Sequence, residues 1–393
     1  MEWTTYQLSD VCTIKKRGVT PKEGVCYALY SLPAFDKSKK PEIVYGQEIK
    51  SNKFSIQNNT ILFNKLNVRF KRVWNIKELK HSNNICSTEF FPLSVKGDVE
   101  QDFLYYYLIS DHITEILKKS LSGTSSSHQR IDLNLFLQLP INLPSISDQR
   151  KIAGILSALD SKIENNNKIN ANLEAQAQAL FKSWFVDFTP FKDQPFVDSE
   201  LGPIPQGWKV GKLGDIALQS TEKVLTRNDV KVLSPITTGK LVLSEEYFTK
   251  QVFSKSIRNY KIVKQGAFAY NPARVNIGSL GMNEFKFDGC VSPVYVVFEC
   301  LKGYSFFFDL FRKTDFFKQA VISFAIGGVR QTLNYSDFAL IDVTIPPQNI
   351  VQSFNEIYLH LKKKISINEE ENQRLAALRD TLLPKLMSGE IKL

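Results

Sequence analysis

Few residues of this chain have the types and spacing that catalysis requires. Residues 271–274 read Asn-Pro-Ala-Arg, which lacks the second proline and the aromatic residue of an amino-methyltransferase NPPY motif, and no glycine-rich loop for S-adenosylmethionine accompanies them. The Glu-x-Lys pattern of nucleases occurs four times without an upstream Pro-Asp, and no GxxxxGK[ST] loop for ATP is present. We therefore expect a chain that is not an enzyme.

Metal and redox chemistry are not expected either. The histidines at positions 81, 112, 128 and 360 are scattered, and the five cysteines include no CxxC pair. The first residues lack the pattern of a signal peptide, and no apolar run approaches the ~20 residues of a membrane span. A reducing cytoplasm is the expected compartment.

What remains is binding chemistry, which begins with charge. The 393 residues carry 50 Lys and Arg against 40 Asp and Glu, a net charge of +10. Residues 1–143 hold +5 and residues 194–346 hold +4, while the two segments that follow them hold 0 and +1. Two basic modules joined by neutral spacers suit an anionic partner such as nucleic acid. Ordinary solvated lysines are the alternative explanation of the charge alone.

The chain also repeats itself at an offset of about 205 residues. An opening segment W-x4-L-x-D occurs twice, with Trp3, Leu8, Asp10 and Val11 answered by Trp208, Leu213, Asp215 and Ile216. Each copy continues through strand-like runs, for example residues 60–63 and 291–298, and then a polar loop containing glycine and arginine, at 122–130 and 325–332. Each closes on a strand ending in proline, at 139–144 and 341–347, and then enters a helical segment.

The two helical segments share one heptad register. Apolar residues at spacings of four and three, with two asparagines in the middle of each run, predict two long helices in coiled-coil packing. The helix interface is predicted at Ile152, Leu156, Leu159, Ile163, Asn166, Asn170, Leu173, Leu180, Phe354, Tyr358, Leu361, Ile365, Asn368, Asn372, Leu375 and Leu382. Pro384 is expected to end the second helix near Leu383.

An antiparallel pairing of the helices about a pseudo-twofold axis places Asn166 beside Asn372 and Asn170 beside Asn368. Buried asparagines that meet in this way set helix register and orientation. The alternative is that the four asparagines face solvent or contact another subunit.

These residues resemble one known family, the DNA-specificity subunits of type I restriction-modification enzymes, over the whole chain. The most specific segments are LRDTLLPKLMSGEI at 378–391, LFKSWFVDF at 180–188, LGPIPQGW at 201–208 and LFNKLNVRFKRVW at 62–74. The resemblance implies an α+β fold in which two target-recognition domains, at 1–145 and 207–346, are separated by antiparallel helical spacers at 146–190 and 347–393, with a linker at 191–206. It also implies that each domain reads half of a split double-stranded DNA target.

Partners follow from the same resemblance. Two methyltransferase subunits are expected to dock on the helices, and restriction subunits to complete a cleaving defence complex. S-adenosylmethionine, ATP and magnesium are expected on those partners and no cofactor in this chain. The alternatives are a stand-alone or regulatory DNA-binding relative and, disfavoured by the missing motifs, a fused restriction-modification enzyme. The heptad stripe from residue 152 to 184 spans ~50 Å at 1.5 Å per residue, so we expect half-sites a DNA turn (~34–36 Å) or slightly more apart.

Candidate DNA contacts are the Lys, Arg, Asn and small residues of five polar stretches. They are Lys15, Lys16, Arg17, Lys65, Asn67, Arg69, Lys71, Arg72, Ser125, Ser126, His128, Arg130, Asn271, Arg274, Asn276, Gly327, Gly328, Arg330 and Gln331. Residues 65–72 are predicted to alternate along a strand and loop, so that several share a face, whereas residues 15–18 are equally explained as a solvated turn. Weaker candidates are Arg227, Lys255, Arg258 and Lys261.

Overall fold

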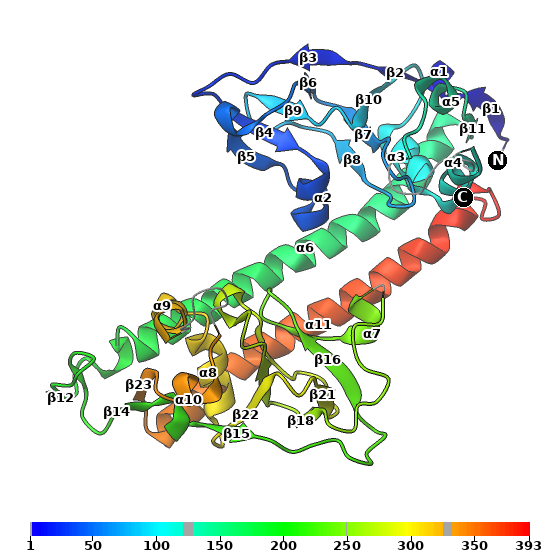
Figure 1. The fold of residues 1–393 in the computed structure, drawn as a ribbon. Helices are drawn as coiled ribbons and strands as arrows, with labels where there is room; N and C mark the ends of the chain where they lie inside the picture. The colour runs from blue at the N-terminus through cyan, green and yellow to red at the C-terminus, as the bar shows by residue number, and fades with distance from the viewer. Residues whose placement is uncertain (1, 121–128, 249, 325–331) are drawn as a thin grey trace. The chain divides into compact units, whose positions relative to one another are not determined.

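The computed structural model describes residues 2–120, 129–248, 250–324 and 332–393, which form two compact units (Figure 1). Unit 1 comprises Met1–Asn167 and Glu369–Leu393, and unit 2 comprises Lys168–Asn368. Each unit therefore contains one copy of the sequence repeat and one part of each long helix. The predicted domain boundaries are a different division, and they stay predictions.

Unit 1 is built around a four-stranded and a five-stranded sheet. The four-stranded sheet has the order β2-β10-β7-β8, the five-stranded sheet has the order β3-β6-β9-β4-β5, and β1 pairs with β11. Within the second sheet β4 and β9 are parallel. The strands are β1 (Thr4–Gln7), β2 (Cys12–Ile14), β3 (Arg17–Val19), β4 (Cys26–Tyr30), β5 (Glu42–Tyr45), β6 (Lys53–Ser55), β7 (Thr60–Asn64), β8 (Val73–Ile76), β9 (Asn84–Cys86), β10 (Phe90–Val95) and β11 (Pro140–Leu143).

Unit 2 repeats this topology with one strand fewer, because its second sheet has no counterpart of the edge strand β3 among the described residues. Its sheets have the orders β15-β22-β19-β20 and β17-β16-β21-β18, β16 and β21 are parallel, and β14 pairs with β23. The strands are β14 (Lys209–Lys212), β15 (Ala217–Ser220), β16 (Lys231–Pro235), β17 (Leu241–Leu243), β18 (Lys261–Val263), β19 (Phe268–Tyr270), β20 (Leu280–Met282), β21 (Gly289–Val291), β22 (Val296–Cys300) and β23 (Asp342–Ile345), with β12 (Phe196–Val197) and β13 (Ile204–Pro205) in the linker. The α+β class with two repeated domains and two long helices is confirmed.

The repeated opening segment has the same function in both units. The backbone N–H of Leu8 donates to Leu139 at 2.9 Å, and that of Leu213 donates to Ile341 at 2.8 Å. One prediction for the second copy is wrong in detail, because residues 291–298 are not a single strand. A turn in which Tyr295 N–H donates to the Ser292 carbonyl separates β21 from β22, so the same apolar run supplies a strand to each of two sheets.

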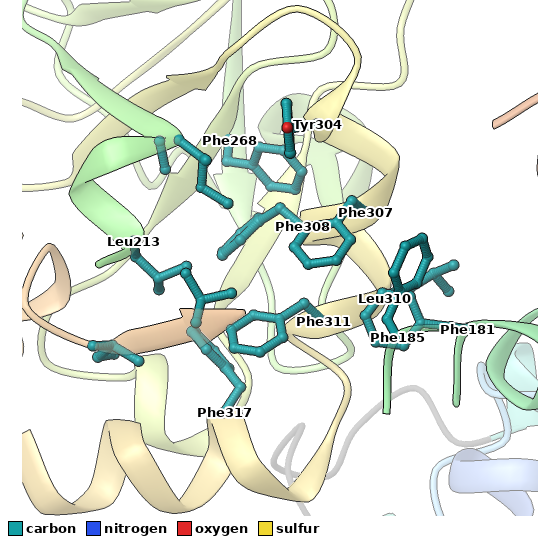
Figure 2. Packing of buried hydrophobic residues seen from close by; sticks show 14 of the residues in the cluster. Phe181, Phe185, Leu213, Phe268, Tyr304, Phe307, Phe308, Leu310, Phe311 and Phe317 are labelled. Atoms are coloured by element: carbon teal, nitrogen blue, oxygen red, sulfur yellow. The ribbon is translucent and has the colours of Figure 1, made fainter. Parts of the chain in front are cut away.

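Short helices cover the sheets and close the cores. They are α1 (Leu8–Val11), α2 (Leu32–Ser38), α3 (Gln101–Ile109), α4 (Asp111–Ser120), α5 (Leu133–Leu137), α7 (Ser244–Tyr247), α8 (Tyr304–Phe311), α9 (Asp315–Phe324) and α10 (Tyr335–Phe338). The aromatic side chains of α8 fill the centre of unit 2. Phe308 packs edge-on against Phe268 of β19, with ring centroids 4.9 Å apart. Figure 2 shows this cluster beside Phe181 and Phe185.

The two long helices, α6 (Ile146–Phe185) and α11 (Gln348–Met387), belong to these cores. In unit 1, Ile152 and Leu156 of α6 and Leu386 of α11 join the buried cluster of the first domain. In unit 2, Phe185 of α6 packs edge-on against Phe354 of α11 at 4.8 Å within the cluster of the second domain. Every predicted interface position is buried or half-buried.

The second helix does not end near Leu383 as expected, because α11 continues through Pro384 to Met387. A proline inside a helix costs ~3 kcal/mol. Leu383, Leu386 and Met387 are all buried in the core of unit 1, and burial of such side chains contributes ~1.5–3 kcal/mol each. Packing of the last turn therefore outweighs the proline.

The seam asparagines meet in the two pairs that the heptad register predicts. Within unit 1, Asn166 donates from Nδ2 to Oδ1 of Asn372 at 3.0 Å, and within unit 2, Asn368 donates from Nδ2 to Oδ1 of Asn170 at 2.7 Å. Asn166, Asn170 and Asn368 are buried, so neither solvent nor a further subunit is their partner. The pairing runs antiparallel within unit 1, since Asp160 contacts Arg379 while Asn166 contacts Asn372. It runs antiparallel within unit 2 as well, since Asn170 contacts Asn368 while Phe185 contacts Phe354.

We predict that Asn368→Ala lowers the free energy of unfolding by ~1–3 kcal/mol, because the buried amide of Asn170 loses its partner. Replacing both Asn170 and Asn368 with leucine is expected to restore stability, since no unpaired polar group then remains. The measurement is the urea midpoint of the full chain, with the exposed Asn165→Ala on α6 as the matched control. Equal midpoints for Asn368→Ala and Asn165→Ala would contradict a stabilising pair.

A buried carboxylate ties α8 to the strand β20. Asp309 accepts from Nη2 of Arg312 at 2.6 Å, and Arg312 donates from Nη1 to the Leu280 carbonyl at 2.8 Å and from Nη2 to the Gly239 carbonyl at 3.1 Å. Burial opposes ionisation of Asp309, but Arg312, Lys313 and Lys362 outweigh it and hold the pKa of its carboxyl below the usual range. The pair thereby positions the start of β20.

Asp309→Asn is expected to destabilise the chain by ~3–5 kcal/mol, because it leaves the guanidinium of Arg312 buried without its counter-charge. Since the folded pKa of Asp309 lies below that of the unfolded chain, its contribution is full above pH ~4 and disappears as the pH falls through the folded pKa. Urea midpoints at pH 7 and pH 3 measure both effects. The variant should lose less stability on acidification than the parent, and the exposed Asp315→Asn should match the parent at both pH values.

Candidate nucleic-acid interface

The repeat gives each unit one hairpin loop of the same length. The loop lies at the same end of two equivalent sheets, β2-β10-β7-β8 in unit 1 and β15-β22-β19-β20 in unit 2. The first loop connects β7 to β8, where Phe63 pairs with Val73, and the second connects β19 to β20, where Tyr270 pairs with Leu280. Adding 207 to either residue of the first pair gives the second pair. Residues 64–72 and 271–279 are therefore equivalent, position by position, and both contain candidate DNA contacts.

The two loops also share several hydrogen bonds, although their backbones differ at Asn67, which has a positive φ of 59°, and at the equivalent Arg274, which has a φ of −139°. Oδ1 of Asn64 accepts from the Leu66 N–H at 2.9 Å, and Oδ1 of Asn271 accepts from the Ala273 N–H at 3.1 Å. The other shared bonds are Asn64 N–H to Arg72, Phe70 N–H to Asn67, Asn271 N–H to Ser279, and Ile277 N–H to Arg274, each to the carbonyl and each between 3.1 and 3.2 Å. A buried valine at the same position anchors each loop, Val68 in one and Val275 in the other. Residues 271–274 are thus a turn.

The chain that follows each predicted glycine-containing loop returns to its hairpin loop. The Ile131 N–H donates to the Lys65 carbonyl at 2.9 Å, and the Leu333 N–H donates to the Pro272 carbonyl at 3.1 Å. Arg130, adjacent to Ile131, consequently lies beside the first hairpin loop. The remaining candidates of these segments lie outside the described residues: Ser125, Ser126, His128, Gly327, Gly328, Arg330 and Gln331.

Two lysines from separate segments meet over one aromatic ring in unit 1. The Nζ atom of Lys16 lies 5.4 Å from the ring centroid of Phe91, and that of Lys65 lies 5.9 Å from the same centroid. Within the described part of the chain neither lysine forms a salt bridge, and the same holds for Lys15, Arg17 and Arg69. These side chains keep a positive charge that no carboxylate neutralises.

Other candidates in unit 1 are already paired. Arg72 binds Asp36 through both Nε and Nη2 at 2.7 Å, Lys71 contacts Asp111 at 2.7 Å, and Arg130 contacts Glu89 at 2.8 Å. Residues 65–72 do not alternate along a strand, because β7 ends at Asn64 and Asn67 has a positive φ of 59° within the loop that follows. Two of the loop cations still have a common neighbour, since Arg69 and Arg72 both lie over the ring of Phe70.

The remaining candidates differ in their surroundings. Arg17 lies on β3 at the edge of the five-stranded sheet, and Lys15 precedes it in an exposed connection. Arg274 and Asn276 are exposed in the second hairpin loop. Lys255 and Arg258 are also exposed.

Two weaker candidates are engaged within unit 2. Arg227 pairs with Asp229 at 2.6 Å and Asp288 at 3.0 Å. Lys261 donates to the Tyr295 carbonyl at 2.6 Å, and burial lowers the pKa of its ammonium group. Both side chains stabilise the domain from within, so they are poorer candidates for contacting DNA.

The sequence prediction of DNA contacts missed an exposed apolar residue that both loops have. Each loop exposes a large apolar side chain at the same position, Phe70 with 46% of its surface accessible and Ile277 with 56%. Aligning the two copies at the hairpin offset of 207 would have found it, since both segments then read Asn-x3-Val-x-apolar. The offset of 205 taken from the opening segment hides the match.

We predict that Lys65→Ala weakens binding to double-stranded DNA and lowers the slope of log Kd against log salt concentration by about 0.9, the effect of one lost phosphate contact. The control is Lys192→Ala, which removes the same charge from an exposed position in the linker. Titrations at several salt concentrations measure both slopes. If the two variants lose the same slope, Lys65 contributes only to net charge.

Comparison with known proteins agrees with the repeat. A family model described as the type I restriction modification DNA specificity domain matches residues 1–175. The chain is 30% identical over 313 residues to the type I restriction enzyme MjaIX specificity subunit of Methanocaldococcus jannaschii, covering 76% of this chain and 70% of that protein. It is 24% identical over 379 residues to the HindI specificity subunit of Haemophilus influenzae, covering 79% and 82%.

Among solved structures, a type I restriction-modification S subunit from M. genitalium has the same fold. Its TM-score is 0.57 at 15% sequence identity, and the alignment covers 98% of this chain and 96% of that one. The described residues contain no helix long and apolar enough to cross a membrane, and no cluster of three or more potential metal ligands from His, Cys, Asp or Glu.

Proposed function

The chain belongs to the DNA-specificity subunits of type I restriction-modification enzymes, and on that premise we propose that its two repeated domains each read one half of a split DNA target. As a specificity subunit it recognises DNA sequence for such an enzyme and is not itself the catalytic subunit. The observation that supports two half-sites is the duplicated hairpin loop, which has the same length and the same anchoring residues in both copies but two different sets of exposed side chains.

The difference between the anchoring positions and the exposed positions of each loop supports this proposal. Positions that hold the backbone are the same in both copies, Asn64 with Asn271 and Val68 with Val275. Exposed positions differ, since Arg69 is answered by Asn276. Side chains that read base edges must differ when the two half-sites differ, whereas the scaffold need not. We assign base reading to the exposed loop positions, and phosphate contact to the unpaired cations Lys16 and Lys65.

The helices are the proposed docking surface for methyltransferase subunits. Because α6 and α11 repeat one heptad register, a subunit that recognises one helix and its domain finds an equivalent surface on the other, which favours two methyltransferase subunits for each specificity subunit. Restriction subunits complete the cleaving complex in this proposal. S-adenosylmethionine, ATP and magnesium then bind those partners.

Two measurements test the proposal. Purification of the tagged full chain from its source cell should recover an adenine methyltransferase at two copies per chain. Methylome sequencing of the same cell, with and without the intact chain, should find a motif of two short half-sites separated by an unread gap that disappears with the chain. A contiguous motif would contradict the two-domain assignment, and recovery of a DNA-binding chain without a methyltransferase would favour a stand-alone regulator.

A further inference from the structure

Each hairpin loop exposes one large apolar side chain at the equivalent position, Phe70 or Ile277, which we call the tip residue. Isolated exposed apolar side chains are common on protein surfaces, so neither Phe70 nor Ile277 alone indicates a function. An exposed apolar side chain at the same position of both repeated loops does indicate one. The two loops have the same length and several equivalent hydrogen bonds, and among their shared residues the asparagine makes the turn and the valine is buried. The side chain of the tip residue has no hydrogen-bonding group and stays about half exposed in both units.

Cations accompany the apolar tip. In unit 1 the guanidinium carbons of Arg69 and Arg72 lie 4.9 and 4.6 Å from the ring centroid of Phe70. Arg72 is held by Asp36, and Arg69 forms no salt bridge among the described residues. In unit 2 the exposed Arg274 lies in the same loop as Ile277. An apolar tip beside positive charge suits insertion into a polyanion that has an apolar interior, which describes stacked base pairs between phosphate strands.

The kind of contact follows from comparing the two copies. A side chain that recognises a particular base should change between domains that read different half-sites, as Arg69 and Asn276 do. A side chain that acts on any sequence should keep its character. Phenylalanine and isoleucine share bulk and apolarity but no hydrogen-bonding group, and both are residues that proteins insert between base steps.

We propose that Phe70 and Ile277 are apolar wedges, each inserted at one base step of its half-site so that the neighbouring bases unstack. This inference rests on the proposed recognition of a split DNA target and adds a mechanical role to it. Enzymes that modify a base must take it out of the duplex stack, and a base step that is already loosened costs less to open. The wedges would prepare each half-site for the modification subunit.

The test uses the full chain and a duplex carrying its methylome-defined motif, with 2-aminopurine placed in turn at each position of one half-site. Fluorescence of this base rises when it unstacks. We expect a several-fold rise at one step of each half-site on binding of the parent chain. Phe70→Ala should abolish the rise in the half-site read by unit 1 and preserve it in the other, Ile277→Ala should do the reverse, and neither should weaken binding by more than about tenfold.

Matched variants separate the wedge from general damage. Phe70→Leu keeps an apolar side chain and should retain most of the rise, while Phe196→Ala in the linker and Ile43→Ala on β5, which remove other exposed apolar side chains, should leave both signals unchanged. Urea midpoints verify that each variant is folded. If Phe70→Ala binds the motif with the full fluorescence rise, the wedge is refuted while DNA recognition stands. If the parent chain does not distinguish its motif from random duplex, the proposed function fails instead.

Discussion

Burial of the long helices in the domain cores is the interaction on which the rest of this structure depends. In unit 1 the first turns of α6 and the last turns of α11 supply Ile152, Leu156 and Leu386 to the core. In unit 2 the opposite ends of the same helices supply Phe185 and Phe354. Neither core is complete without both helices. The same buried contacts therefore determine both the register of the helix seam and the position of each domain on its own helix segments.

The same dependence reaches the hairpin loops through the strands that carry them. In unit 2, β19 contributes Phe268 to the aromatic cluster, and β20 begins at Leu280, whose carbonyl accepts from Arg312 at the end of α8. In unit 1, β7 contributes Phe63, whose ring packs at a tilt against Phe136 with centroids 4.7 Å apart. Rigid strands with buried anchors allow the exposed loop positions to vary without loss of fold, which is the requirement for one scaffold to present different recognition surfaces.

Charge is distributed less simply than the net value of +10 indicates. Arg72, Lys71, Arg130 and Arg227 each have a carboxylate within hydrogen-bonding distance, whereas Lys16 and Lys65 lie over an aromatic ring. A cation that must first leave a carboxylate contributes less to phosphate binding than one held over a π face, because the existing pair offsets part of the gain. Pairing within the domain therefore separates the candidate DNA contacts into cations held by a carboxylate and cations that are not.

Periodicity and repetition determined much of this protein at the level of sequence. The heptads located α6 and α11 and paired the correct asparagines, because a 3.5-residue period specifies a helix face without reference to distant residues. The opening W-x4-L-x-D segments likewise identified the duplicated domains. Only tertiary structure decided that the helix continues through Pro384, that residues 291–298 divide between two sheets, and which cations are paired. Each of these depends on contacts between residues far apart in the chain, such as Leu386 with the core of unit 1 and Arg72 with Asp36. Local pattern cannot contain that information, because packing and ion pairing are properties of neighbours that folding brings together.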